Sequence, residues 1–287
     1  MRVQTRLAGD RRVRYDFAIG MAFSIIDIHT HIFPDELAPR AVKQLAGRSG
    51  ETAFLDGTAA GLEESMRRHG IGISVTQPVS TKASQIPSIN AFAIALQQRS
   101  GLVNFGSLFP DYEGNAAEIE RLREAGIKGV KFHPDYQQFY VDEERMFPLY
   151  RLMADAGLIA FFHAGVDIGL GPPYHGLPDR LATVLERVPD LTVVAAHFGG
   201  FQLWDDVERH LVGKNLYFDT SYTLSFLDHG RFVDMARRHG IGKILFGSDS
   251  PWADQGVEIE LHRKCGLTQT ELAAVFHDNA AQLLGVQ

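Results

Sequence analysis

The sequence predicts a (β/α)₈ barrel of parallel strands with one extra helix at its C-terminus. Eight short apolar segments recur along the 287 residues, and after a first interval of about 49 residues their starts are about 25–33 residues apart. Between them lie stretches with the apolar period of an amphipathic helix. Alternation of strand and helix at this spacing is typical of βα units and a parallel sheet, and eight such units close most simply into a barrel.

The expected strands are apolar on both faces, as parallel strands are when helices cover one side and a barrel core fills the other. The segments 158–162 (LIAFF) and 191–196 (LTVVAA) show this most clearly. The expected strands lie near residues 24–31, 73–79, 102–109, 127–133, 158–164, 191–198, 216–221 and 243–249. An open, doubly wound sheet is the alternative, but no strand is followed by the Gly-x-Gly-x-x-Gly turn typical of that fold.

The intervening helices show their period and their ends in the sequence. Leu181, Val184, Leu185 and Val188 recur at i, i+3, i+4 and i+7, and a second set does the same between residues 146 and 156. Glycines precede the apolar residues that open several strands, at positions 70, 126, 157 and 240. A glycine just beyond the last turn is the preferred helix stop, so we expect these four to end helices.

The two ends of the chain and the first connection complete the predicted fold. Residues 268–284 predict the extra C-terminal helix, with Thr268 and Glu271 as a capping box. The long connection 32–60 predicts a loop and a helix over the barrel mouth. Residues 1–22 carry arginines and acidic residues but no apolar run, so we expect a loosely attached extension rather than a signal peptide, and residues 23–287 as one domain.

Composition excludes several function classes. The formal net charge of −7 argues against a nucleic-acid or anionic membrane partner, and no apolar run approaches the length that spans a bilayer. The single cysteine, Cys265, excludes an intramolecular disulfide and cysteine-rich zinc modules. We expect a cytoplasmic protein that acts on a small molecule, with a homodimer as one oligomeric possibility.

Polar side chains gather where the expected strands end. The active site of a barrel lies at the C-terminal ends of its strands, because the loops that follow meet there. Five histidines and one aspartate fall at this end of five strands: His29 and His31, His133, His163, His197 and Asp249. The remaining histidines have simpler explanations. His69 and His239 precede helix-ending glycines, and His210, His262 and His277 fall on helices, where we expect surface positions.

The residue types at these ends predict a metal site. Neutral imidazoles with one carboxylate suit a zinc-type divalent ion, and His29, His31, His163 and Asp249 would provide four donors. Such an ion lowers the pKa of its bound water toward neutrality. His197 and Asp249 are the expected catalytic residues, His197 to polarise a substrate oxygen or bind the water and Asp249 to transfer its proton. Asp27, one step deeper on the strand, is expected to support neighbouring groups.

The ordered motifs resemble the amidohydrolase superfamily. Ile-Asp-Ile-His-Thr-His (26–31), Gly-Val-Lys-Phe-His-Pro (129–134), Ala-His-Phe-Gly-Gly (196–200) and Phe-Gly-Ser-Asp-Ser-Pro (246–251) are similar to its amidohydrolase-related branch, which includes aminocarboxymuconate-semialdehyde decarboxylase and related metal-dependent hydrolases. The resemblance covers roughly residues 24–285. It implies a distorted barrel, one divalent metal, often zinc, held by His29, His31, His163 and Asp249, and His197 as the catalytic histidine.

Lys131 leaves the number of metal ions open. Two-metal members of the superfamily often use a carboxylated lysine on the fourth strand as a bridge, and Lys131 ends that strand. The sequence around it resembles the one-metal branch, so one ion is the expectation and two the alternative.

Loops and aromatic residues near the strand ends are the candidates for substrate contact. The glycine- and proline-rich loop 169–175 follows the fifth strand and predicts part of the pocket rim. Two arginines of the first connection, Arg40 and Arg48, could hold a substrate carboxylate. The full set of candidate contacts is His133, Tyr174, His175, Trp204, Tyr222, Trp252 and Arg40.

Three functions compete on these residues. The leading hypothesis is a metal-dependent hydrolase of a small amide, ester or lactone. The alternative is a metal-dependent non-oxidative decarboxylase of a small carboxylic acid. A metal-binding protein without activity is disfavoured, because His197 and Asp249 accompany the ligands.

Overall fold

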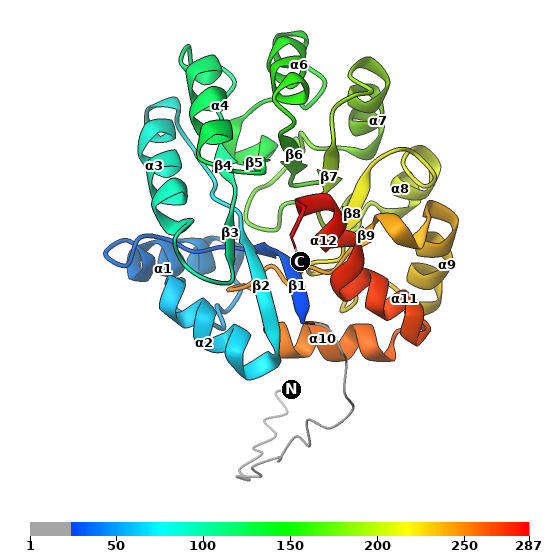
Figure 1. Ribbon diagram of the computed structural model, residues 1–287. Helices are drawn as coiled ribbons and strands as arrows, with labels where there is room; N and C mark the ends of the chain where they lie inside the picture. Colours follow the sequence, from blue (N-terminus) through cyan, green and yellow to red (C-terminus); the bar gives the residue numbers. More distant parts are fainter. Residues whose placement is uncertain (1–23, 287) are drawn as a thin grey trace, which may run out of the picture.

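The computed structural model describes residues 24–286, which form a barrel of parallel strands surrounded by helices (Figure 1). The predicted extension 1–22 lies outside the described residues. The strands, in chain order, are β1 (Ile25–Thr30), β2 (Ile71–Thr76), β3 (Leu102–Asn104), β4 (Gly106–Ser107), β5 (Gly129–Phe132), β6 (Ile159–Phe162), β7 (Val193–Ala195), β8 (Tyr217–Asp219) and β9 (Ile244–Leu245). Each lies in one of the eight predicted segments, except that β2 begins two residues earlier.

Two irregular junctions distort the ring. Its strands divide into a sheet β1-β2-β3 and a sheet β4-β5-β6-β7-β8-β9, all neighbours being parallel. The third predicted segment is split into β3 and β4 at Phe105, whose N–H still bonds to Thr76 O at 3.1 Å. The ring closes where β1 bonds to the residues that follow β9. Ile28 N donates to Phe246 O at 2.9 Å, and Asp249 N donates to His29 O at 2.9 Å. The distorted barrel is therefore confirmed.

Helices cover the outside of the ring and its mouth. The α-helices before the C-terminal segment are α1 (Ala38–Ser49), α2 (Ala59–His69), α3 (Ile86–Leu96), α4 (Asn115–Glu124), α5 (Pro134–Gln137), α6 (Phe147–Asp155), α7 (Pro178–Arg187), α8 (Trp204–His210), α9 (His229–His239) and α10 (Gln255–Lys264). Short 3₁₀ turns occupy Ala83–Gln85, Glu144–Met146 and Ile241–Lys243. The glycines predicted to end helices, at 70, 126, 157 and 240, all have positive φ. No helix of the described residues is long and apolar enough to cross a membrane.

The extra C-terminal helix contains a change of pitch. It runs as α11 (Gln269–Ala273), a π-helical turn (Ala274–Asp278) and α12 (Asn279–Leu284). The predicted capping box is present, since Thr268 Oγ1 accepts from Glu271 N and Glu271 Oε2 accepts from Thr268 N. Ala280 and Leu284 belong to the same buried cluster as Ile26 and Leu245, so α12 packs against the strands that close the ring.

Alternation along β6 separates the barrel interior from the helix layer. Phe161 contacts the His29 ring at a centroid distance of 5.2 Å, so its side chain faces the interior. Phe162 stacks on Phe132 at 5.3 Å and meets the Tyr150 ring of α6 at 5.7 Å, so it faces the helices. Along β6 the interior position is therefore apolar, and the polar residue of this segment, His163, follows the strand end.

One histidine is not where the sequence predicted it. His262 of α10 is fully buried rather than on the surface, and its Nε2 lies 2.7 Å from Thr220 Oγ1. Burial lowers its pKa to about 4, which keeps the ring neutral. His239 is also buried, its Nε2 facing Leu216 O at 3.0 Å, and its pKa is lowered to about 4 by burial. A neutral ring does not gain from the helix dipole, so hydrogen bonding and packing explain His239 instead.

Glu258 of α10 predicts a pH effect on stability. Its side chain is buried, Oε2 has no partner, and burial with the nearby charge of Asp27 raises its pKa to about 8. The folded chain therefore holds a proton that the unfolded chain loses above a pKa of 4.5. Because the folded pKa is raised, this proton's contribution is lost as pH rises from about 4.5 to 8, by at most about 1.4 kcal/mol per pH unit.

We expect Glu258→Gln to remove that dependence. We measure the free energy of unfolding of both proteins by denaturant titration. The value for the variant minus that for the wild type should increase steadily from about pH 4.5 to pH 8 and stay constant outside this window. Glu260→Gln, on an exposed side chain of the same helix, is the control and should show a much smaller difference. A constant difference between Glu258→Gln and wild type from pH 5 to 8 would show that Glu258 is ionised in the fold.

Candidate active site at the strand ends

The residues predicted to form the site come from five different strands and share one end of the barrel. β1 carries His29 and leads directly into His31, β5 carries Lys131, and His163, His197 and Asp249 follow β6, β7 and β9. His133, His163 and His197 are buried, and Lys131 is only 1% exposed. Parallel strands bring these segments together because their carboxyl ends meet at the same edge.

Three of the four predicted ligands meet closely. The Nε2 atoms of His29 and His31 are 3.1 Å apart, and Asp249 Oδ1 lies 3.1 Å from His31 Nε2 and 3.5 Å from His29 Nε2. All three donor atoms lie within 4.8 Å of one another.

Hydrogen bonds on the far side of each ring assign the protons of these histidines. His29 Nδ1 faces Asp219 Oδ2 at 2.9 Å, and His31 Nδ1 faces Gln77 O at 2.7 Å. A carboxylate and a carbonyl oxygen only accept, so each Nδ1 carries a proton, and in the neutral form of each ring Nε2 carries a lone pair. Burial, with the nearby Lys131 charge, lowers the His29 pKa well below its usual value and keeps that ring neutral.

The three atoms that meet, His29 Nε2, His31 Nε2 and Asp249 Oδ1, are therefore acceptors that repel one another. When both rings are neutral, two imidazole lone pairs and a carboxylate oxygen face one another at hydrogen-bond distance without a proton between them. Burial raises the pKa of the Asp249 carboxyl, and positive charge on the rings of His29, His31 and His197 lowers it by more, which keeps the group an anion whenever one of these rings is protonated. A cation at this point removes the repulsion.

Lys131 contributes the positive charge present in the chain itself. Its Nζ lies 3.1 Å from His29 Nε2 and 4.5 Å from the centre of the Phe161 ring. Burial lowers its pKa to about 8, while the charges of Asp219 and Asp249 oppose that shift. The ammonium form is therefore still the main form at neutral pH. The structure brings Lys131 to the predicted site, where its Nζ contacts the predicted ligand His29.

His163 belongs to a neighbouring cluster and is connected to the first through His197. His163 Nδ1 lies 3.1 Å from His197 Nε2, and His197 Nδ1 lies 3.1 Å from Ser221 O. Because the Ser221 carbonyl only accepts, His197 carries its proton on Nδ1. His197 Nε2 therefore accepts a hydrogen bond from the N–H group at His163 Nδ1. This leaves His163 Nε2 with a lone pair. That atom is buried and has no hydrogen-bond partner.

These residues fit a divalent ion. Ligand atoms each about 2.1 Å from one ion lie roughly 3–3.5 Å apart at angles between about 90° and 110°, which matches the spacing of His29, His31 and Asp249. The unpartnered His163 Nε2 is the remaining donor, of the type that the predicted set requires. Three neutral imidazoles and one carboxylate suit zinc and also other divalent transition metals.

Backbone conformation supports a functional role for the loop residues. His197 has φ of 56° and Asp249 has φ of 69°, both in the left-handed region that non-glycine residues seldom adopt. Such conformations cost free energy and persist where the surrounding structure holds them, often at active sites. Both residues are held here by backbone bonds, as in Asp249 N to His29 O at 2.9 Å.

A second group of possible ligands is explained without an ion. His133 Nε2 faces Asp167 Oδ2 at 3.1 Å, and His133 Nδ1 accepts from Tyr136 N at 3.4 Å. One neutral tautomer satisfies both contacts. The His133 and His163 rings also stack at 4.1 Å with an interplanar angle of 9°, so their in-plane lone pairs do not converge on one point. We therefore assign His133 and Asp167 to a hydrogen-bonded pair that joins α5 to the loop after β6.

The other predicted substrate contacts differ in burial, and among them Trp204 has a hydrogen bond to a site residue. Arg40 is exposed on α1, Tyr174 and Trp252 are half-buried, and His175 Nδ1 pairs with Asp135 Oδ1 at 2.7 Å. Trp204 opens α8 and donates from Nε1 to His197 O at 3.4 Å, so it supports that histidine. The Tyr222 ring, half-buried, packs on Phe201 at 5.7 Å. Arg48 lies over the Tyr136 ring at 5.6 Å.

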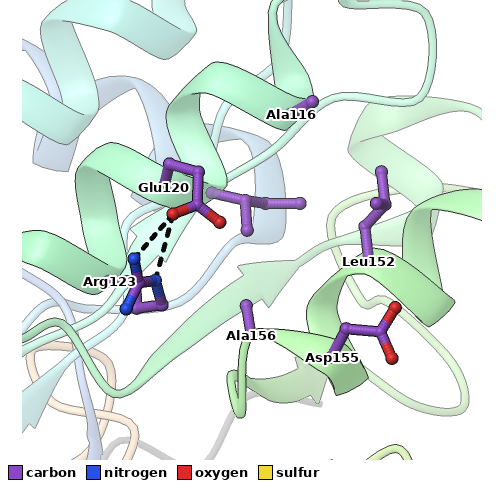
Figure 2. Close-up of a pocket in the computed structure, with 7 residues that line it drawn as sticks. Ala116, Glu120, Arg123, Leu152, Asp155 and Ala156 are labelled. Carbon is purple, nitrogen blue, oxygen red and sulfur yellow. Dashed lines mark hydrogen bonds and ion pairs between the residues drawn. The ribbon is translucent and has the colours of Figure 1, made fainter.

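A shallow cleft on the helix layer lacks this chemistry (Figure 2). It lies between α4 and α6, and its polar contact is the ion pair of Arg123 with Glu120 at 2.8 Å. Leu152, which lines it, is 45% exposed. Its charged side chains, Glu120, Arg123 and Asp155, are all exposed to solvent, so the buried strand ends remain the candidate site.

Sequence reasoning missed Asp219, Ser221 and Asp167. Asp219 and Ser221 occupy the end of the seventh predicted strand, in Asp-Thr-Ser. Their position at a strand end is the same signal that identified the histidines. Asp167 lies four residues beyond His163 in a loop, where the sequence carries no comparable signal.

Comparison with known proteins agrees with the fold and the motifs. The sequence profile described as Amidohydrolase matches residues 26–286. No curated protein sequence matches the chain.

Solved structures share the fold at low identity. An uncharacterized TIM-barrel protein from Bordetella bronchiseptica has 22% identity and a TM-score of 0.73, over 92% of this chain and 99% of that one. A 5-carboxyvanillate decarboxylase from Sphingomonas paucimobilis has 15% identity and a TM-score of 0.67, over 92% and 99%. A dihydroxybenzoic acid decarboxylase from Polaromonas, solved with manganese and the inhibitor 2-nitroresorcinol, has 15% identity and a TM-score of 0.69, over 91% and 97%. With the family profile covering nearly all of the described barrel, this chain belongs to the amidohydrolase superfamily of enzymes.

Proposed function

We propose that this enzyme is a metal-dependent non-oxidative decarboxylase of a small carboxylic acid. The observation that carries the metal dependence is the convergence of His29 Nε2, His31 Nε2 and Asp249 Oδ1 within hydrogen-bond distance without a proton to share. We assign these three atoms and His163 Nε2 as the ligands of one divalent ion, manganese or zinc. When bound, the ion supplies positive charge that polarises substrate oxygens.

The chain's own residues have separate tasks in this reaction. Lys131 places a buried positive charge beside His29, which favours binding of an anionic substrate. As the carbon–carboxylate bond breaks, its electron pair stays on the substrate carbon, a proton is added there and carbon dioxide leaves. Asp249 is the proposed carrier of that proton from solvent, and His197 holds His163 through the Nδ1–Nε2 hydrogen bond.

The solved structures support decarboxylation over hydrolysis. Two of the similar proteins described above are decarboxylases of aromatic acids, and one of them binds manganese. We extend this to an aromatic or otherwise unsaturated acid as substrate, because such a molecule can delocalise the electron pair left on carbon. The sequence alone had favoured hydrolysis.

Hydrolysis of a small amide, ester or lactone is the second candidate, and one observation favours it. Asp249 is ionised, which suits a residue that takes a proton from water better than one that gives a proton to carbon.

Product analysis separates the two reactions. The purified chain, loaded with Mn²⁺ or Zn²⁺, is assayed against aromatic and unsaturated carboxylic acids and against lactones and amides in ¹⁸O-labelled water. We expect carbon dioxide release, deuterium incorporation at the former carboxyl carbon in heavy water, and no ¹⁸O in the organic product. Incorporation of ¹⁸O without carbon dioxide would establish hydrolysis instead.

Metal analysis tests the site itself. We expect one divalent ion per chain after purification without chelator. Two ions would support the carboxylated Lys131 bridge, and none after loading would contradict the proposed site.

A further inference from the structure

We propose that Asp219 and Ser221 are positioning residues that set the proton positions of the site histidines, and thereby its affinity for metal. This inference rests on the proposed function, since it concerns the same ion. Both residues lie at the end of β8, on the opposite side of His29 from its Nε2, and both are fully buried.

Asp219 acts on His29 and on the backbone around it. Its Oδ2 lies 2.9 Å from His29 Nδ1, while its Oδ1 accepts from Ser221 N at 2.7 Å and His197 N at 3.4 Å. With both oxygens occupied by donors, the carboxylate is held in one orientation. It therefore keeps the His29 proton on Nδ1 and directs the Nε2 lone pair toward His31 and Asp249. A carboxylate behind a metal-binding imidazole also increases the ligand's basicity.

Ser221 connects two rings from different strands. Its Oγ lies 2.9 Å from His29 Nδ1 and 3.1 Å from His197 Nδ1, and its carbonyl oxygen lies 3.1 Å from the same His197 Nδ1. A serine hydroxyl has two lone pairs, enough to accept from both Nδ1–H groups. Thr223 Oγ1 donates to the Ser221 carbonyl at 2.9 Å and holds it in place.

The effect of this segment extends to a third ring. Because His197 Nδ1 is protonated, its Nε2 accepts from His163 Nδ1, and the His163 lone pair is forced onto Nε2, the buried atom without a partner. Residues 219–221 thus contribute directly to the tautomer of His29, together with the Lys131 ammonium group at His29 Nε2, and set that of His163 through His197. His31 is independent of them, because its Nδ1 bonds to Gln77 O.

The tautomers are measurable in metal-free protein. In ¹⁵N-labelled full-length chain at neutral pH, imidazole nitrogen spectra should show His29, His197 and His163 as Nδ1–H tautomers. We expect Asp219→Asn to shift His29 from the Nδ1–H form toward the Nε2–H form. Ser221→Ala removes one of the two acceptors at His29 Nδ1 and at His197 Nδ1 but keeps the Ser221 carbonyl, so it should shift the same populations by less. His31 should be unchanged in both variants and serves as the internal control.

Metal affinity gives the second readout. Equilibrium dialysis with Mn²⁺ should show the dissociation constant raised about 10- to 100-fold by Asp219→Asn, and by a smaller factor by Ser221→Ala. Asp228→Asn, which retains the cap of α9 that Asp228 provides, is the matched control and should leave the affinity unchanged.

The outcomes distinguish this inference from the proposed function. If the wild type binds Mn²⁺ and Asp219→Asn and Ser221→Ala keep its affinity and tautomers, the inference is overturned while the metal site stands. If the wild type binds no metal but the histidine tautomers change in the two variants as described, the positioning role stands and the metal-dependent function is wrong. Should Asp219→Asn fail to fold, Ser221→Ala decides the matter alone.

Discussion

Replacing Asp249 with asparagine is expected to lower turnover by about 10²- to 10⁴-fold, because the amide can neither carry the proton nor supply an anionic ligand. The carboxylate faces His31 Nε2 at 3.1 Å and His29 Nε2 at 3.5 Å. An amide nitrogen there would donate to an imidazole lone pair and relieve the repulsion between acceptors. We therefore expect the variant to lose bound metal and to fold, with thermal stability equal to or above that of the metal-free wild type.

The measurement is the rate with the best acid or ester found in the substrate screen, together with metal content and thermal unfolding. Asp254→Asn is the matched control, because Asp254 caps α10 through Val257 N and asparagine caps equally well. Wild-type turnover by Asp249→Asn would exclude Asp249 from proton transfer, whichever reaction the enzyme performs.

Removing the Asp27 side chain is expected to cause the largest loss of stability among these variants. The carboxylate is fully buried and accepts four hydrogen bonds: Ser248 N at 2.9 Å, Ser248 Oγ at 2.6 Å, Gln255 Nε2 at 2.7 Å and His29 N at 3.2 Å. Asp27→Ala removes the acceptor of all four donors and leaves Ser248 Oγ only a contact of 3.5 Å with His29 O. We expect the free energy of unfolding to fall by about 3–5 kcal/mol, as measured by denaturant titration.

Asp27→Asn should cost much less, on the order of 1 kcal/mol. The asparagine oxygen can still accept from the two backbone N–H groups. Its amide can donate to Gln255 Oε1, which has no partner in the wild type, if the Gln255 amide turns over. Equal losses for the alanine and asparagine variants would show that charge at this position, rather than hydrogen bonding, stabilises the closure of β1 on β9.

The sequence was informative where a local pattern of apolar residues or glycines was sufficient to predict a strand or a helix end. Apolar segments at regular spacing predicted the strands, and Gly70 and Gly157 marked helix ends that have positive φ in the structure. It was less informative where packing intervenes. The break at Phe105 between β3 and β4, and the burial of His262, depend on neighbours that no local pattern specifies.

The candidate site divides in the same way. Sequence by itself determined which side chains stand at the strand ends, because the carboxyl ends of parallel strands must meet and His29, His31, His163, His197 and Asp249 occupy them. It also indicated the family, through motifs that each lie within a few residues.

Only the tertiary structure decided which nitrogen of each ring is available. His29 bonds to Asp219, 190 positions away, and His163 bonds to His197, 34 positions away. A tautomer is set by whatever acceptor lies behind the ring, and a local pattern does not contain that partner. The structure thus shows Asp219 and Ser221 behind the site histidines, pairs His133 with Asp167, and leaves His163 Nε2 as a buried atom without a hydrogen-bond partner.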